Sequence, residues 1–324
     1  TSDTLGPIFL ERPDTLGRGK LNVNITYQYV DLNEFDGTST KHLQSADPII
    51  VRETDANGNF SRFTANRLRY KFSLVNHVEG VSVTYGILDD LDVNLLIPLI
   101  ETTSDVTAER RQVAVETTPG AGFVPQPAPE REGTSNGAHS GVGDILLRTK
   151  YQFLRRGVWR SGAGLQLRLP SGDKNNFQGT GNFEVSPAVY LSALLWSRVE
   201  PHLNVAVDLR TDDVSQSQAR YGFGVDGDIT PRVGVALAFL GRSEFKRSSP
   251  PGATSFLHLT PSGPAERPLL GVNFDRKDYF DLSFGARAVV WHDVMLFVNG
   301  IYALNDDGLR NDSVIPTVGL EGTF

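Results

Sequence analysis

A few groups of residues in this chain have the types and spacing that binding or catalytic chemistry requires. Gly222, Gly224 and Gly227 are spaced as in the dinucleotide fingerprint G-x-G-x-x-G. That motif works only between a strand and the N-terminus of a helix, which holds the pyrophosphate. Here the glycines lie inside an alternating, strand-like stretch, so nucleotide binding is not expected. They are expected to make room for side chains of neighbouring strands or to ease curvature.

Metal and hydrolase chemistry are the other candidates. None of the six histidines has a ligand spacing such as H-x-x-x-H, and most fall in expected loops or turns; they are His42, His77, His139, His202, His258 and His292. The acidic groups Asp212-Asp213 and Asp306-Asp307 with Asp312 could hold calcium or cations that bridge lipopolysaccharide, although solvated loop acids are the preferred interpretation. No metal site and no cofactor is therefore predicted.

A serine hydrolase would need a serine beside a histidine, with a third group that orients the imidazole. His139 and Ser140 are the only histidine and serine that are neighbours in the sequence. Neighbours on a strand point to opposite faces, so this pair does not form a catalytic site. The chain is expected not to be an enzyme, and no catalytic residue is predicted.

Composition excludes further classes. The 324 residues include no Cys, which excludes disulfides, thiolate metal sites and a cysteine nucleophile. A net charge of −7 argues against nucleic-acid binding. No run approaches the 18 or more apolar residues of a membrane helix. The chain does not open with a basic and then apolar leader, so a secretory signal is either absent or removed, and Thr1 is a candidate mature terminus.

The elements that must position any functional side chain are strands, because apolar residues recur at every second position over most of the chain. Leu91, Val93, Leu95, Ile97 and Leu99, opposite Asp92 and Asn94, are a representative case. Short turns alternate with long connections along the chain. The short turns are at 89–90, 155–157, 197–198, 230–231 and 292–293, and the long connections are at about 34–67, 103–141, 171–181, 212–217, 245–277 and 306–312. This order predicts an up-and-down antiparallel meander.

One stretch decides the strand count. Residues Leu68 to Ile87 are either two strands with a turn near His77, which gives thirteen strands, or one long strand, which gives twelve. Leu68, Tyr70, Phe72 and Leu74 are out of phase with Val81, Val83, Tyr85 and Ile87, and an inserted bulge residue would produce that slip. We therefore expect one bulged strand, and a closed all-β barrel of twelve strands.

The polar face of the strands indicates a membrane barrel. It carries too many charges for a small packed core, whereas in a water-filled lumen these charges cost little; the expected lumen-lining residues are Arg148, Lys150, Arg168, Glu184, Asp208, Arg220, Asp226, Asp281 and Arg287. The other face is almost free of charge, as lipid contact requires. The prediction is a transmembrane barrel of the bacterial outer membrane with short periplasmic turns and long extracellular loops.

Two further signals agree with an outer-membrane barrel. Trp159, Trp196 and Trp291 all lie beside short turns, where one rim of an aromatic girdle is expected. The chain ends in an alternating strand closed by Phe324, which resembles the signal read by the barrel assembly machinery, although Gly322 replaces the usual large apolar residue.

Several ordered motifs resemble a bacterial outer-membrane family named for a putative MetA pathway of phenol degradation. They are Gly6-Pro7-Ile8-Phe9 with Leu16-Gly17-Arg18-Gly19, Tyr85-Gly86-Ile87, Asp90-Leu91-Asp92-Val93, Ile97-Pro98-Leu99, Gly143-Asp144-Ile145-Leu146-Leu147, Leu169-Pro170-Ser171-Gly172-Asp173 and Gly179-Thr180-Gly181. Each motif is weak alone, and together they span most of the chain. The resemblance implies a barrel that passes hydrophobic or aromatic compounds, and it supplies no catalytic residues.

These patterns lead to one functional hypothesis and one alternative. Residues 1–20 are expected to form a periplasmic plug through Ile8, Phe9 and Leu10, or a tether along the rim, with a single barrel at 21–324. If the axis is closed, Pro187 in mid-strand is the candidate lateral gap, because it removes a ladder donor. The expected function is passive uptake of small molecules by a monomer surrounded by outer-membrane lipids and lipopolysaccharide. The alternative is a barrel that does not transport and scaffolds a partner through its loops.

Overall fold

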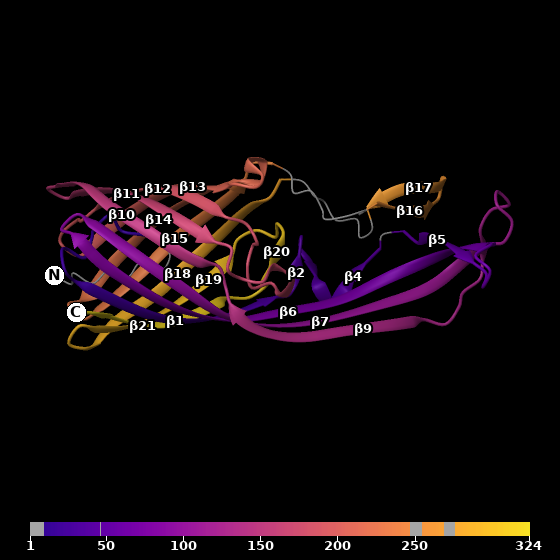
Figure 1. Cartoon of the computed structure of the whole chain (residues 1–324), viewed down its shortest axis with the longest axis horizontal. Coiled ribbons are helices and arrows are strands. Elements are labelled where there is room, and N and C mark those ends of the chain that lie inside the picture. The colour runs from indigo at the N-terminus through magenta and orange to yellow at the C-terminus, as the bar shows by residue number, and fades with distance from the viewer. Residues whose placement is uncertain (1–9, 46, 247–254, 269–275) are drawn as a thin grey trace.

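The computed structural model describes residues 10–45, 47–246, 255–268 and 276–324. Twelve antiparallel strands form a closed barrel (Figure 1). They are β1 (Leu21–Leu32), β6 (Phe60–Leu88), β7 (Leu91–Glu116), β10 (Ile145–Arg156), β11 (Trp159–Leu169), β12 (Glu184–Ala193), β13 (Val199–Arg210), β14 (Gln218–Thr230), β15 (Val233–Glu244), β18 (Asp278–Trp291), β19 (Val294–Ala303) and β21 (Ile315–Thr323). The predicted fold class and strand number are confirmed.

Short elements accompany the barrel. They are β2 (Glu34–Phe35), β3 (Thr38–Ser39), the 3-10 helix η1 (Thr40–His42), β4 (Leu43–Gln44), β5 (Ile49–Thr54), β8 (Val124–Pro125), β9 (Arg131–Val142), η2 (Lys174–Asn176), η3 (Val214–Gln216), β16 (Ser255–Thr260), β17 (Gly263–Pro268) and β20 (Leu309–Arg310). In the described part of the chain, no helix is long and apolar enough to cross a membrane.

The barrel closes between its first and last strands. Asn22 to Gln28 of β1 pair with Thr323 to Thr317 of β21, and the other edge of β1 pairs with β6. The short turns predicted between consecutive strands are present, and Figure 1 places the start of β1 and the C-terminus at the same end as these turns. We call this the short-turn end.

Alternation sets the two faces of the wall. Residues such as Ile25, Val83 and Leu237 point outward and are more than a third exposed, while Asn22, Asp92 and Asp226, on β1, β7 and β14, are buried inside. The strands therefore carry an apolar outer face and a polar inner face, as their period of two predicts.

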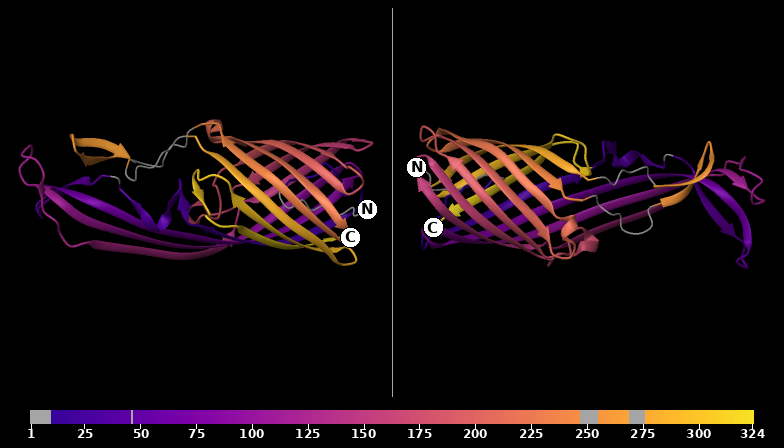
Figure 2. Two further views of the ribbon diagram at one scale, coloured as in Figure 1. Left: turned by 180° about the vertical axis from the view of Figure 1, so that it is seen from behind. Right: turned by 90° about the horizontal axis from the view of Figure 1, so that it is seen from above.

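An arm continues one side of the wall far beyond the barrel (Figures 1 and 2). We define it as residues 60–73 of β6, residues 103–116 of β7, the strand β9 and the strands β4, β5 and β8 that pair with them. At about 3.3 Å per residue, the 29 residues of β6 span roughly 95 Å, about three times what a membrane strand needs.

The arm corrects two of the predicted long connections. Residues 34–67 and 103–141 were expected to be loops, but β6 begins at Phe60, β7 runs to Glu116, and β9 occupies 131–142. The expectation was wrong because these strands lie outside the barrel, where neither face has to be uniformly apolar.

The expected bulge between Leu74 and Val81 is also absent. The β6–β7 register stays constant from Arg67, opposite Arg111, to Gly86, opposite Asp92; shifts occur only at 65–66 and 86–88. The strand is single, as predicted, but its phase change has another origin. The apolar side chains move from the outer face of the barrel to the inner face of the arm.

Candidate functional site: the lumen and the N-terminal segment

The N-terminal segment, residues 10–20, crosses the inside of the barrel at the short-turn end. Glu11 lies 3.8 Å from Arg148 and 3.7 Å from Lys150 of β10. Asp14 lies 3.2 Å from Arg160 of β11, and the backbone N–H of Leu16 donates to Asp92 of β7 at 2.9 Å. The segment is thus tied to several strands around the wall.

Arg12 is the most enclosed charge in this segment. Its guanidinium donates two hydrogen bonds to Asp226 of β14, the Nε bond at 3.1 Å, and lies 3.6 Å from Glu200 of β13. Asp226 also lies 3.4 Å from His202 and 3.6 Å from Arg287. A buried charge needs paired and hydrogen-bonded neighbours, and this cluster supplies them.

Leu10 occupies space left by two glycines. A Cβ at Gly222 would lie 2.4 Å from Leu10 Cδ2, and a Cβ at Gly224 would lie 2.7 Å from Leu10 Cδ1. Two of the three glycines of the apparent dinucleotide motif, Gly222 and Gly224, therefore make room for a side chain of the N-terminal segment, and they border Leu240 and Ala238 of β15. Of the predicted plug residues, Leu10 is buried, and Ile8 and Phe9 lie outside the described residues.

Glu11, Arg12 and Asp14 were not among the residues singled out from the sequence. Their partners are 137 to 214 positions away, and no local pattern connects them. One signal was available: three charged residues stand within four positions directly after an apolar triplet, in a segment without strand periodicity.

The nine predicted lumen residues all lie on the inner face, and most form ion pairs. Arg220 lies 2.7 Å from Asp208, Arg168 lies 3.5 Å from Glu184, and Arg287 lies 3.0 Å from Asp228. Asp281 pairs with Arg310 at 2.8 Å. Opposite charges are therefore matched, in Arg220–Asp208 and Arg168–Glu184 across adjacent strands and in the other two pairs over a longer reach, which lowers the cost of placing them inside a narrow barrel.

Pro187 lies on the outer face of β12, at a local gap in the ladder to β13. Glu184 and Val185 pair with Arg210 and Leu209, and pairing resumes in the same register at Ala188 and Ala206. The intervening pairs at Ser186 and Pro187 are missing, although Pro187 remains aligned with Leu165 of β11. The wall is thus weaker on one side of Pro187 without any change of register.

Asp144 explains two of the sequence motifs as one structural element. Its carboxylate accepts hydrogen bonds from the backbone N–H of Gly172 at 3.1 Å and of Thr180 at 2.8 Å, and from the Thr180 hydroxyl at 2.7 Å. The Ser171 hydroxyl donates to Gly143 O at 2.8 Å. These contacts fasten the β11–β12 loop to the point where β9 passes into β10.

The predicted rim residues lie at the short-turn end and face outward. Trp159, Trp196 and Trp291 are 63%, 84% and 70% exposed. Phe324 is 74% exposed, while its backbone exchanges hydrogen bonds with Leu21 at 2.7 and 2.9 Å. The last residue is therefore part of the seam between β1 and β21.

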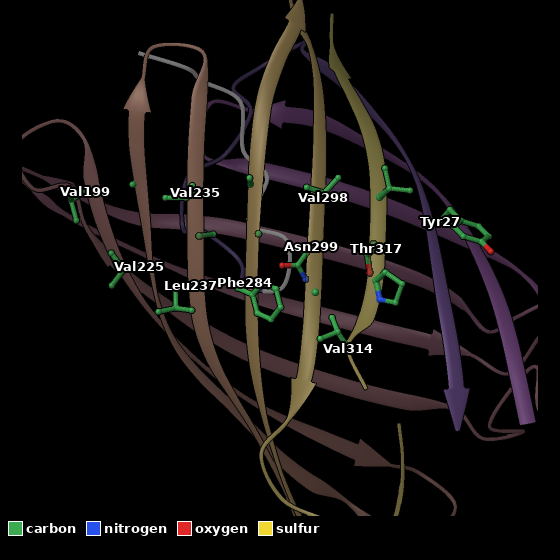
Figure 3. A pocket seen from close by; sticks show the side chains of 17 residues that line it. Tyr27, Val199, Val225, Val235, Leu237, Phe284, Val298, Asn299, Val314 and Thr317 are labelled. Carbon is green, nitrogen blue, oxygen red and sulfur yellow. The ribbon is translucent and has the colours of Figure 1, made fainter. Parts of the chain in front are cut away.

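An apolar groove of about 960 Å³ lies on the outer face, across β14 to β21 (Figure 3). Exposed side chains, among them Val235, Leu237, Phe284 and Val298, border it, and the small outward residues Gly227 and Ala286 make it shallow. It belongs to the same apolar surface as the rest of the outer wall.

The remaining candidates do not form a reactive site. His77, His139, His202 and His258 lie on strands, so the expectation that most histidines lie in loops was wrong. Asp213 caps η3 and Asp312 accepts from Asn33, so these acids organise loops. No group of three or more His, Asp or Glu suited to a metal ion occurs among the described residues. His139 and Ser140 point to opposite faces of β9.

Solved structures with this architecture are outer-membrane barrels. The chain superposes on the COG4313 outer membrane channel from Pseudomonas putida F1 with a TM-score of 0.54 and 12% identity, covering 99% of this chain and 100% of that one. More distant are the NanC porin (TM-score 0.43, 11% identity, 94% and 98% covered) and the CymD monoaromatic hydrocarbon channel (0.37, 8%, 95% and 89%). Curated proteins give no match.

The closed twelve-stranded barrel, with its apolar outer face, is a protein of the bacterial outer membrane. The model of one protein family matches residues 52–240, more than half of the sequence. The motifs around Asp144 lie within this range. The chain belongs to the family described as "Putative MetA-pathway of phenol degradation".

Proposed function

We propose that this chain is an outer-membrane channel or transporter for passive uptake of small molecules, with hydrophobic or aromatic compounds as substrates. The observation that carries the proposal is the N-terminal segment, which crosses the lumen and is held there by side-chain ion pairs and hydrogen bonds. Such contacts can separate without unfolding a strand. In this proposal residues 1–20 are a periplasmic plug, and residues 21–324 are the barrel that it closes.

Single-channel conductance and liposome swelling test this function. The full chain and a variant that lacks residues 1–18 are reconstituted, and uptake of a small polar sugar and of toluene is measured in both. We expect greater flux of the sugar through the shortened chain, and toluene uptake by the full chain above that of empty liposomes. Absence of flux in both proteins would contradict the proposal.

The second candidate is a non-transporting scaffold that holds a partner through its extracellular parts. The arm favours it, because a structure that extends so far beyond the membrane offers a large surface. The same flux measurement separates the two functions, since a scaffold passes no solute with or without the segment.

A lateral exit is part of the transport proposal. If the plug closes the axis, an apolar substrate would leave through the wall beside Pro187, where two pairs of the β12–β13 ladder are missing. An apolar molecule gains free energy by entering lipid directly.

Other expectations remain part of this proposal. The three tryptophans are proposed to anchor the periplasmic rim in the lipid interface, and Phe324 to be read by the assembly machinery. We also propose a monomer surrounded by lipids and lipopolysaccharide, since both edges of the barrel sheet pair with each other.

A further inference from the structure

The two faces of the arm have the opposite polarity from those of the barrel. In the barrel part of β6, outward residues such as Val81 and Val83 are apolar. In the arm, Arg67, Arg69 and Lys71 occupy the outer face and are exposed. The register with β7 is unbroken between these regions, so no slip of the backbone turns the side chains over.

The inner face of the arm is therefore the apolar one, and it is a continuation of the lumen wall. Leu68, Tyr70 and Phe72 of β6 lie on it, opposite Arg110, Ala108 and Val106 of β7. Figure 1 shows this sheet running from the barrel wall past the mouth, so the apolar stripe leads toward the lumen. Tyr70 and Phe72 are two residues apart, about 7 Å, which is the width of an aromatic ring.

Packing inside the arm covers the inner face at both ends of this stripe, at Leu74 next to the barrel and at Asn66 and Thr64 toward the tip. Leu74 is 2% exposed and lies beneath the segment that contains η1, which contacts β6. Between Leu74 and the lumen, the Thr102 hydroxyl donates a hydrogen bond of 2.8 Å to Asn76 Oδ1. Farther out, Leu68, Tyr70 and Phe72 are only half-buried.

The neighbouring strand β9 leaves the stripe open on one side. Gly133 and Gly137 lie on the same inner face, opposite Ala108 and Ser104. A Cβ at Gly133 would have no other atom within 4 Å. Burial in these partly apolar surroundings raises the pKa of the Tyr70 hydroxyl. Partly exposed apolar side chains that continue across glycines of a neighbouring strand, on the water side of the membrane, can contact an apolar ligand.

We propose that the inner face of the arm, centred on Tyr70 and Phe72, is an extracellular binding site for small apolar or aromatic molecules, which it delivers to the mouth of the lumen. The delivery part rests on the proposed transport function. The binding part does not, because capture by an apolar surface requires only the surface. The outer face, with its arginines and lysine, keeps the arm in water while the inner face holds the ligand.

Binding is tested with a tryptophan placed on each face of the same strand. In a background with Trp159→Phe, Trp196→Phe and Trp291→Phe, the variants Phe72→Trp and Ser73→Trp are titrated with 4-nitrotoluene, an apolar quencher. We expect saturable quenching at position 72 and weak, linear quenching at 73. Equal, linear quenching at both positions would overturn the proposal. Retention of the folded form on unheated gels shows that each barrel is intact.

Delivery is tested by toluene uptake into liposomes at limiting concentration. Phe72→Asp places a charge in the proposed site and is expected to lower uptake about tenfold, while Ser73→Asp on the outer face leaves it unchanged. Equal uptake by both variants would overturn delivery while leaving the transport function intact. A third outcome is that the unsubstituted chain takes up no toluene while quenching at position 72 is saturable. That result would contradict both the transport function and delivery, and it would support the binding site.

Discussion

Arg12 and Asp226 are 214 residues apart in the chain, yet the Arg12 Nε donates to Asp226 Oδ2 at 3.1 Å, with both side chains buried inside the barrel. Asp226 also faces His202 and Arg287, so removal of Arg12 would leave a rearranged but still charged cluster. This pair ties the N-terminal segment to the strand on which Leu10 rests, and it is the contact that we expect to keep the segment in place.

Arg12→Ala should therefore release the segment. Breaking one partner of a buried pair costs about 3 to 5 kcal/mol, which is enough to shift a closed segment toward the open state. We expect higher single-channel conductance than in the unsubstituted chain. Arg18→Ala is the matched control, because the Arg18 side chain is exposed and only its backbone contacts Asp89. Equal conductance in both variants would show that Arg12 does not hold the segment.

Gly222→Leu should release the segment from the other side. The new side chain would occupy the space of Leu10 Cδ2, which lies 2.4 Å from the position of an added Cβ. Gly227→Leu is the control, since a Cβ there meets nothing within 4 Å. The double variant with Arg12→Ala should conduct no more than the stronger single variant, because both act on one segment. Additive effects would indicate two separate closures.

Asp144→Ala should loosen the outer end of the barrel. It removes the acceptor for two backbone N–H groups and one hydroxyl, at an expected cost of about 2 to 4 kcal/mol. The temperature at which the folded band disappears on gels should fall, while Asp293→Ala in an exposed turn should leave it unchanged. An unaltered transition in Asp144→Ala would show that the loop contacts do not support the barrel.

Pro187→Val would restore a backbone donor toward β13 and close the local gap in the ladder. We expect lower uptake of toluene with unchanged ion conductance, because the lateral route and the axial route are separate. Pro201→Val is the control, since Pro201 is already aligned with Val225 in the β13–β14 ladder. If Pro187→Val passes toluene as fast as the unsubstituted chain, the substrate does not leave at this position.

The tip of the arm should lose stability in acid. The hydrogen bond from Arg62 holds the pKa of Glu53 below its ordinary value, against the effect of burial. A lowered pKa in the folded state contributes stability above the ordinary pKa, and that contribution is lost as the pH falls through the lowered value. The protection of the β5 amides against hydrogen exchange, after correction for the intrinsic rate at each pH, should therefore fall below about pH 4. Glu53→Gln should show faster exchange at neutral pH and little change on acidification.

The barrel could be predicted because every one of its strands has one apolar and one polar face. The alternation of residues such as Leu91 to Leu99, together with the short turns, indicated the meander, and twelve strands followed from taking Leu68 to Ile87 as one strand, although the bulge used to justify that is absent. The arm could not be predicted in the same way. Beyond the membrane the outer face of β6 carries Arg67 and Arg69, so the pattern that identified the barrel is reversed there.

The site was predictable only in part. The presence of charges on the inner face follows from the alternation. Which charges pair depends on which strands are adjacent and on the register between them, as Arg220 and Asp208 illustrate. The contacts of Glu11, Arg12 and Asp14 depend on where a segment without periodicity lies in space. Sequence separation gives no information about that.

The arm also constrains how the barrel can be inserted into the membrane. The β6–β7 turn lies at the periplasmic end, and the charged strands beyond it emerge on the opposite side. Moving Arg67, Arg69 and Lys71 through hydrocarbon would cost about 2 to 4 kcal/mol each at its centre. The N-terminal segment crosses the finished barrel at its short-turn end, so the arm is not expected to be threaded through the lumen afterwards. We therefore expect the arm to reach the cell exterior while the sheet is still open, before β1 joins β21.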